Sequence, residues 1–93
     1  MPMFAAIART EMDPATLDDA QLGHMVSVVE QHPGFVSGTW GRDTARPSTV
    51  HAVVVFEGRH HAEAFAAGVR GALADAQVDV AEVLARAAAG ASG

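Results

Sequence analysis

The sequence predicts a small α+β domain in which a four-stranded antiparallel sheet carries two helices on one face. Four short segments rich in apolar, β-branched and aromatic side chains have the length and composition of strands. Two further segments repeat apolar residues at the i, i+3, i+4, i+7 spacing of a helix that packs on a core. The six segments alternate as βαββαβ, which is the order of the ferredoxin-like fold.

The four predicted strands are the most apolar stretches of the chain. They cover residues 3–11, 35–43, 48–57 and 77–86. Residues 44–47 separate the two middle strands and are typical of a hairpin loop. We therefore expect the second and third strands to be direct neighbours in the sheet.

The first helix has two alternative starting points. Asp13 offers a cap with proline at the next position, and Thr16 with Asp19 offers a second cap a turn later. From either start the helix should end near Gln31, because a Pro-Gly pair follows closely. Its core-facing stripe would consist of Leu22, Met25, Val26 and Val29.

The second helix is expected after Gly58. Gly68 and Gly71 each lower helix stability by up to about 1 kcal/mol relative to alanine, so the last turns should be irregular or packed closely on the sheet. The apolar face of this helix would consist of Ala62, Phe65, Ala66, Val69 and Leu73.

Size and charge restrict what the protein can do. The 93 residues form a single domain, which we place at residues 1–88, followed by a flexible C-terminal tail at residues 89–93. A net charge of −5 argues against nucleic acid and against an anionic membrane surface, because both partners require a basic face.

The chain contains no cysteine, which excludes disulfides, thiolate-bound metals and cysteine nucleophiles and fits a reducing compartment. It also has no recognisable signal peptide and no apolar run of roughly 20 residues that could span a membrane. We therefore expect a cytoplasmic protein.

The strands carry apolar side chains on both faces, although two helices can cover only one face. In the third strand Val53 and Val55 point away from the side of Val54 and Phe56. A sheet face left uncovered in this way is prone to associate, most commonly through a two-fold axis. We expect a homodimer formed through the sheet face; a monomer with an unusually apolar surface is the alternative.

The predicted hairpin suggests a candidate site. If residues 44–47 form a four-residue loop, Arg42 lies opposite Thr49 and Trp40 lies opposite His51. Trp40, Arg42 and His51 would then share one face and could bind an aromatic or acidic small molecule. A purely structural Trp–His packing pair is the alternative, and an error of one residue in register would remove the alignment.

The other histidines give weaker signals. His60 and His61 are adjacent on a helix and point about 100° apart, so they cannot easily share a metal ion. We interpret them as solvated residues, His24 as a rim residue and His32 as part of the helix-to-strand junction. No metal site is expected.

Several short motifs resemble the antibiotic-biosynthesis-monooxygenase-like family of dimeric α+β-barrel proteins, and the resemblance spans nearly the whole chain. They are the opening strand from Phe4 to Glu11, His32-Pro33-Gly34-Phe35, Gly38-Thr39-Trp40, and the run from Val53 to Glu57 followed by Ala62 to Phe65. The resemblance implies a homodimer whose sheets face each other, with a pocket between sheet and helices in each subunit.

Members of this family include cofactor-independent oxygenases of aromatic polyketides and haem-degrading enzymes. The chain departs from the haem-degrading branch, since Phe56 stands where that branch has tryptophan and the sequence has no asparagine. It also lacks tyrosine, a pocket residue of the polyketide oxygenases.

Two functional hypotheses follow. In the first, the homodimer oxygenates an aromatic substrate without a cofactor, and His51 or Arg42 stabilises the substrate anion. In the second, it is a non-catalytic dimeric binding or accessory module.

Overall fold

The computed structural model describes residues 2–87 and 89. Its elements are β1 (Phe4–Glu11), α1 (Asp19–Glu30), β2 (Phe35–Arg42), β3 (Thr49–Phe56), α2 (Arg59–Ala72) and β4 (Gln77–Glu82). The strands form one antiparallel sheet in the order β2-β3-β1-β4. This confirms the predicted ferredoxin-like α+β fold, whereas the tail expected at 89–93 lies outside the described residues except for residue 89.

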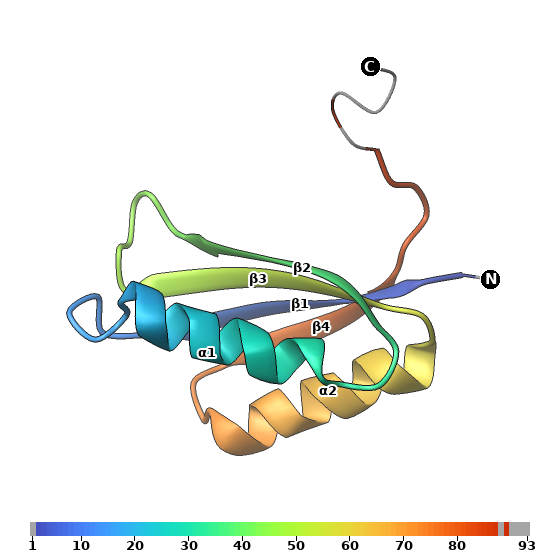
Figure 1. The fold of residues 1–93 in the computed structure, drawn as a ribbon, viewed down its shortest axis with the longest axis horizontal. Coiled ribbons are helices and arrows are strands. Elements are labelled where there is room, and N and C mark those ends of the chain that lie inside the picture. Colours follow the sequence, from blue (N-terminus) through green and yellow to red (C-terminus); the bar gives the residue numbers. More distant parts are fainter. Residues whose placement is uncertain (1, 88, 90–93) are drawn as a thin grey trace.

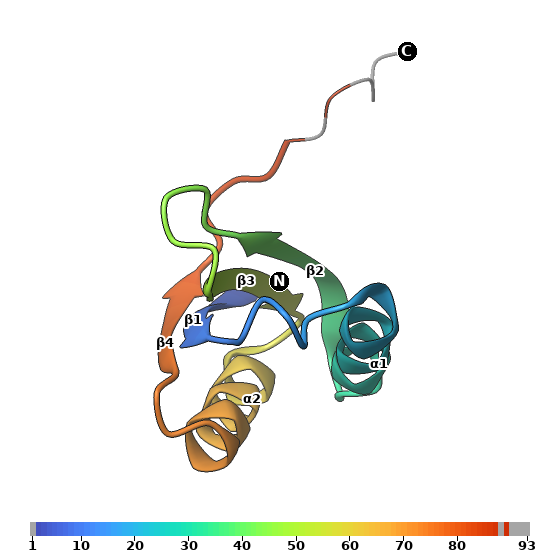
Figure 2. The same ribbon diagram turned by 90° about the vertical axis from the view of Figure 1, so that its left-hand side faces the viewer.

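Both helices lie on the same face of the sheet (Figure 1). α1 packs against β2, and α2 packs against β1, β3 and β4, so the helices sit side by side beneath a curved sheet (Figure 2). The core between α2 and the sheet centres on Phe56 and Phe65, whose rings lie 5.2 Å apart. In contrast, only Val29 of α1 is fully buried. This leaves α1 less tightly packed than α2.

Neither predicted start of α1 is correct. The Asp13 carboxylate accepts the backbone N–H of Ala15 at 2.9 Å, and the Thr16 N–H donates to the Asp13 carbonyl, so this segment closes a separate turn. The helix instead begins after Asp18, whose carboxylate accepts the N–H of Gln21 at 2.8 Å. The C-terminal end is close to the prediction, since Gln31 is the C-cap.

The prediction for α2 is confirmed in its start after Gly58 and in the buried residues Ala62, Phe65 and Ala66. Leu73 does not belong to this buried face, because it is the C-cap and is 45% exposed. Gly68 and Gly71 do not interrupt it, since the helix continues to Ala72. In the described part of the chain, neither helix is long and apolar enough to cross a membrane.

β4 is shorter than expected, ending at Glu82 rather than near residue 86. Just past the end of the strand, the Val83 N–H still donates to the Met3 carbonyl at 2.8 Å. Beyond it, Arg86 donates to the Ser37 hydroxyl at 3.2 Å, and Leu84 is 89% exposed.

Gly34 forms the tight junction between α1 and β2. Its φ of +79° lies in the left-handed region that favours glycine, and a Cβ at this position would collide with the His61 ring. His60 is exposed as expected, but His61 is half-buried here, and its Nδ1 has no hydrogen-bond partner among the described residues.

Candidate ligand pocket

The hairpin between β2 and β3 sets which residues reach the helix-covered face. The observed pairs are Arg42 with Val50, Gly41 with His51 and Trp40 with Ala52. The predicted register is therefore wrong by one residue.

The loop is one residue longer than predicted because Asp43 organises it. Its carboxylate accepts the backbone N–H groups of Ala45 and Arg46 at 2.8 and 2.9 Å, while its own N–H donates to the Thr49 carbonyl at 2.9 Å. Asp43 therefore lies opposite Thr49 rather than Ser48, and every pair along the ladder shifts with it.

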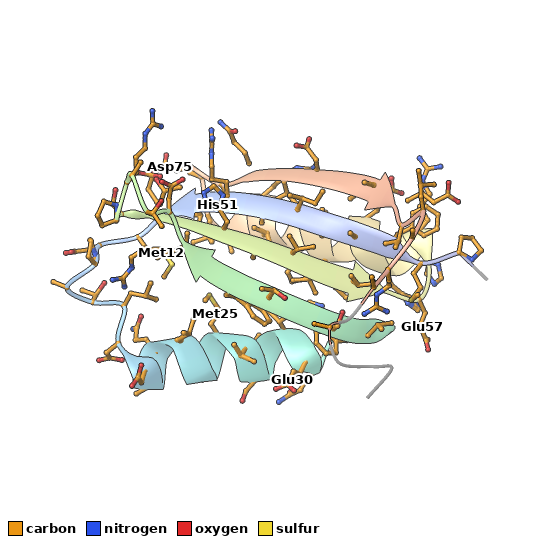
Figure 3. The ribbon with its side chains drawn as sticks, turned by 90° about the horizontal axis from the view of Figure 1, so that it is seen from above. Met12, Met25, Glu30, His51, Glu57 and Asp75 are labelled. Carbon is orange, nitrogen blue, oxygen red and sulfur yellow. The ribbon has the colours of Figure 1, made fainter. Side chains whose placement is uncertain are left out.

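This shift separates the three predicted site residues. Trp40 and Arg42 lie on the side covered by the helices. His51 lies on the opposite, open face, onto which Figure 3 looks. The structure thus keeps Trp40 and Arg42 together and excludes His51 from their surroundings.

His51 has a structural partner on the open face. Its Nε2 lies 2.8 Å from Oδ2 of Asp43, and both groups are partly exposed to solvent. The hydrogen bond from His51 lowers the pKa of Asp43 below its ordinary value, and the N–H groups of Ala45 and Arg46 lower it further. The hydrogen bond between His51 and Asp43 therefore links the start of the hairpin loop to β3.

A large pocket, the inner pocket, opens between α1, α2 and the sheet. Its volume is about 700 Å³, which falls in the range of small-molecule sites. Its walls are almost entirely apolar, and two of the lining side chains, Val28 and Leu73, remain nearly half exposed. The lining residues are Ala8, Thr10, His24, Met25, Val28, Val29, His32, Trp40, Val50, Ala52, Phe65, Gly68, Val69, Ala72 and Leu73.

Trp40 forms part of the sheet side of this pocket. Gly38, two residues earlier on the same strand, leaves room for the indole, because a Cβ there would collide with the ring edge. The half-buried indole therefore lies along β2 and offers an aromatic surface to the pocket.

His24 and His32 are the titratable residues among those lining the inner pocket. His32 is half-buried and meets Phe65 edge-on, with ring centroids 5.2 Å apart at an interplanar angle of 89°. The sequence alone indicated no role for His32 beyond the junction. His24 lies on α1, whereas His32 follows the C-cap Gln31, so only the tertiary structure brings the two imidazoles to one pocket.

A smaller hollow, the outer hollow, adjoins the inner pocket and shares Trp40 and Val50 with it. Its volume is about 230 Å³. The remaining lining residues are Leu17, Asp18, Asp19, Leu22, Gly41 and Arg42. Within residues 2–87 and 89, no three His, Asp or Glu side chains lie close enough together to hold a metal ion.

No family model and no curated protein sequence matches the chain, but several solved structures do. A proposed antibiotic biosynthesis monooxygenase from Bordetella bronchiseptica has a TM-score of 0.67 at 15% identity, covering 91% of this chain and 100% of that one. SnoaB from Streptomyces nogalater, a cofactor-independent oxygenase, has a TM-score of 0.60 at 17% identity, covering 97% and 99%. This chain has the fold of these monooxygenases.

Two further structures share the fold. The monooxygenase ActVA-Orf6 of Streptomyces coelicolor, solved with the ligand nanaomycin D, has a TM-score of 0.55 at 20% identity and covers 94% and 90% of the two chains. A dimeric ferredoxin-like protein from an uncultured marine organism has a TM-score of 0.51 at 13% identity, with 94% and 100% covered. The resemblance to the antibiotic-biosynthesis-monooxygenase-like family is confirmed at the level of the fold.

Proposed function

We propose that this protein binds a flat aromatic small molecule in the inner pocket and oxygenates it without a cofactor. The observation that carries the proposal is the apolar volume of about 700 Å³ with Trp40 on its wall. An indole stacks on aromatic rings in offset or edge-to-face geometry, and apolar walls favour a ligand of the same character. The fold of SnoaB, a cofactor-independent oxygenase, supports the reaction type.

The chemistry requires a group that accepts a proton from the substrate. An imidazole nitrogen with a free lone pair accepts protons, so His24 or His32 can take the proton of an acidic ring hydroxyl or methylene and leave an electron-rich anion in the pocket. His51 cannot play this part, because it lies on the other face of the sheet.

The electrons for oxygen must then come from the substrate itself. Conversion of a ring methylene to a carbonyl balances without an external reductant, since one methylene group and one molecule of dioxygen give one carbonyl group and one molecule of water. In this scheme one oxygen atom enters the product, and the other leaves as water together with both methylene hydrogens. The protein orients the substrate and holds the proton.

Incubation with 1,8-dihydroxyanthrone under ¹⁸O-labelled dioxygen tests the proposal. We expect the rate of anthraquinone formation to exceed the uncatalysed rate, with one ¹⁸O atom in the product carbonyl. The double variant His24→Gln/His32→Gln should lose the acceleration and still bind the product. Binding of ring compounds by the wild-type protein without any acceleration would instead favour a non-catalytic binding module.

The proposed working unit is a homodimer formed through the open sheet face. On this face Ile7 and Val53 lie opposite each other and are 45% and 43% exposed. The next positions on this face are apolar, namely Ala5, Val55 and Ala81, whereas Asp79 lies directly opposite Ile7 on β4 and Thr39 opposite Val53 on β2. A second copy that covers this patch would remove apolar surface from water, and the polar end of the face, with Arg9 and His51, would form the rim.

A further inference from the structure

The outer hollow differs from the inner pocket in its chemistry. It combines the guanidinium of Arg42 with the carboxylates of Asp18 and Asp19, whereas the inner pocket contains no charged carboxylate or guanidinium. Because both spaces border Trp40 and Val50, a ligand lying against the indole can extend from one into the other.

Arg42 and the two aspartates do not neutralise each other directly. Within the described residues the ion pairs are His51–Asp43 and Arg59–Glu63, so Arg42 has no carboxylate partner. The Asp18 carboxylate already accepts the Gln21 N–H as the cap of α1. Arg42 and the exposed Asp19 therefore remain available, one as a donor and the other as an acceptor.

We propose that the ligand has two parts: an aromatic ring system in the inner pocket and an uncharged, hydroxyl-bearing substituent in the outer hollow. The inference rests on the proposed function, since it requires an aromatic ligand beside Trp40. A hydroxyl group accepts a hydrogen bond from Arg42 and donates one to Asp19, which matches both groups at once.

A carboxylate substituent fits this hollow less well. It can accept from Arg42, but it has no proton to donate and approaches two carboxylates of the same sign. A methyl substituent makes no hydrogen bond with the guanidinium. The hollow thus distinguishes three ligands that share one ring system.

Titration of Trp40 fluorescence with three 1,8-dihydroxyanthraquinones tests the inference, because Trp40 is the single tryptophan. The compounds carry methyl, hydroxymethyl or carboxylate at position 3. We expect hydroxymethyl to bind about tenfold more tightly than methyl, the effect of one hydrogen bond to a charged group, and more tightly than carboxylate. Arg42→Gln should abolish the advantage over methyl, whereas Arg46→Gln, in the hairpin loop outside the hollow, should preserve it.

Asp19→Asn provides the complementary variant, because it removes a negative charge without touching the helix cap. It should increase the affinity for the carboxylate compound several-fold and leave the affinity for the methyl compound unchanged. Equal affinities of wild-type protein for methyl and hydroxymethyl, or tightest binding of carboxylate, would overturn the inference while the proposed binding of aromatic rings stands. Failure of all three compounds to bind would overturn both.

Discussion

Trp40 lies directly opposite Ala52 across the β2–β3 ladder, so the indole faces the helices and borders the inner pocket. The small side chain of Ala52 leaves space beside the indole, and Gly38 leaves space along it. This arrangement makes the single tryptophan of the chain a direct reporter of the pocket.

Substitution of Gly38 should disturb the pocket more than it disturbs the fold. In Gly38→Ala the new methyl group meets the far edge of the Trp40 ring, which can rotate away, so we expect a changed tryptophan emission maximum and several-fold weaker binding of a dihydroxyanthraquinone. Gly41→Ala is the matched control, because a Cβ there has open space around it. Identical emission and affinity for the two variants would contradict the described position of the indole.

Gly34 should be among the least replaceable glycines. Gly34→Ala places a Cβ at positive φ and against the His61 ring, and we expect it to lower the free energy of unfolding by about 1–2 kcal/mol in urea titrations. Gly23→Ala, inside α1 with nothing near its Cβ position, should raise this free energy by up to about 1 kcal/mol. Equal effects of the two substitutions would show that the α1–β2 junction is not strained by a side chain.

The hairpin should weaken in acid. Because the pKa of Asp43 is lowered in the folded protein, its contribution to stability is present above the ordinary aspartate pKa and is lost as the pH falls through the lowered value. In a carboxyl-carbon NMR titration His51→Ala should raise the pKa of Asp43 only in part, since the Ala45 and Arg46 N–H groups remain. An unchanged pKa would exclude His51 as the main cause.

The homodimer should depend on the open face. Wild-type protein should scatter light as a species of twice 9.6 kDa, and Val53→Asp should produce a folded monomer, because it places a charge in the apolar patch. Ala64→Asp, at an exposed position of α2, should leave the mass unchanged. A wild-type monomer at high concentration would refute the proposed interface.

The order of the elements could be predicted because it depends on patterns that many residues share. The apolar repeat of a strand or helix remains recognisable when one or two positions do not fit it. In α2, for example, Gly68 and Gly71 are poor helix formers, yet the helix continues to Ala72. The register of the hairpin depends instead on one side chain. The Asp43 carboxylate accepts two backbone N–H groups, and the loop is one residue longer than predicted. His51 therefore lies on the face of the sheet opposite to the predicted one.

The start of α1 was missed for a similar reason. Asp13 and Asp18 are both good capping residues, and only the local turn at Asp13 decides between them. The inner pocket needed the tertiary structure, because its walls come from both helices and three strands. His24 and Val28 are one helical turn apart on α1, but His32 lies beyond the C-cap Gln31, so helical spacing could not relate it to them.

The most direct test of the ligand pocket uses two residues that each occur once in the chain. Trp40 borders the inner pocket, and Ile7 lies on the open face of the sheet. NMR titration with a 1,8-dihydroxyanthraquinone should shift the indole N–H signal of Trp40 progressively and leave the δ-methyl signal of Ile7 in place. A shift of the Ile7 signal with an unchanged Trp40 signal would place the ligand on the open face of the sheet and contradict binding in the inner pocket.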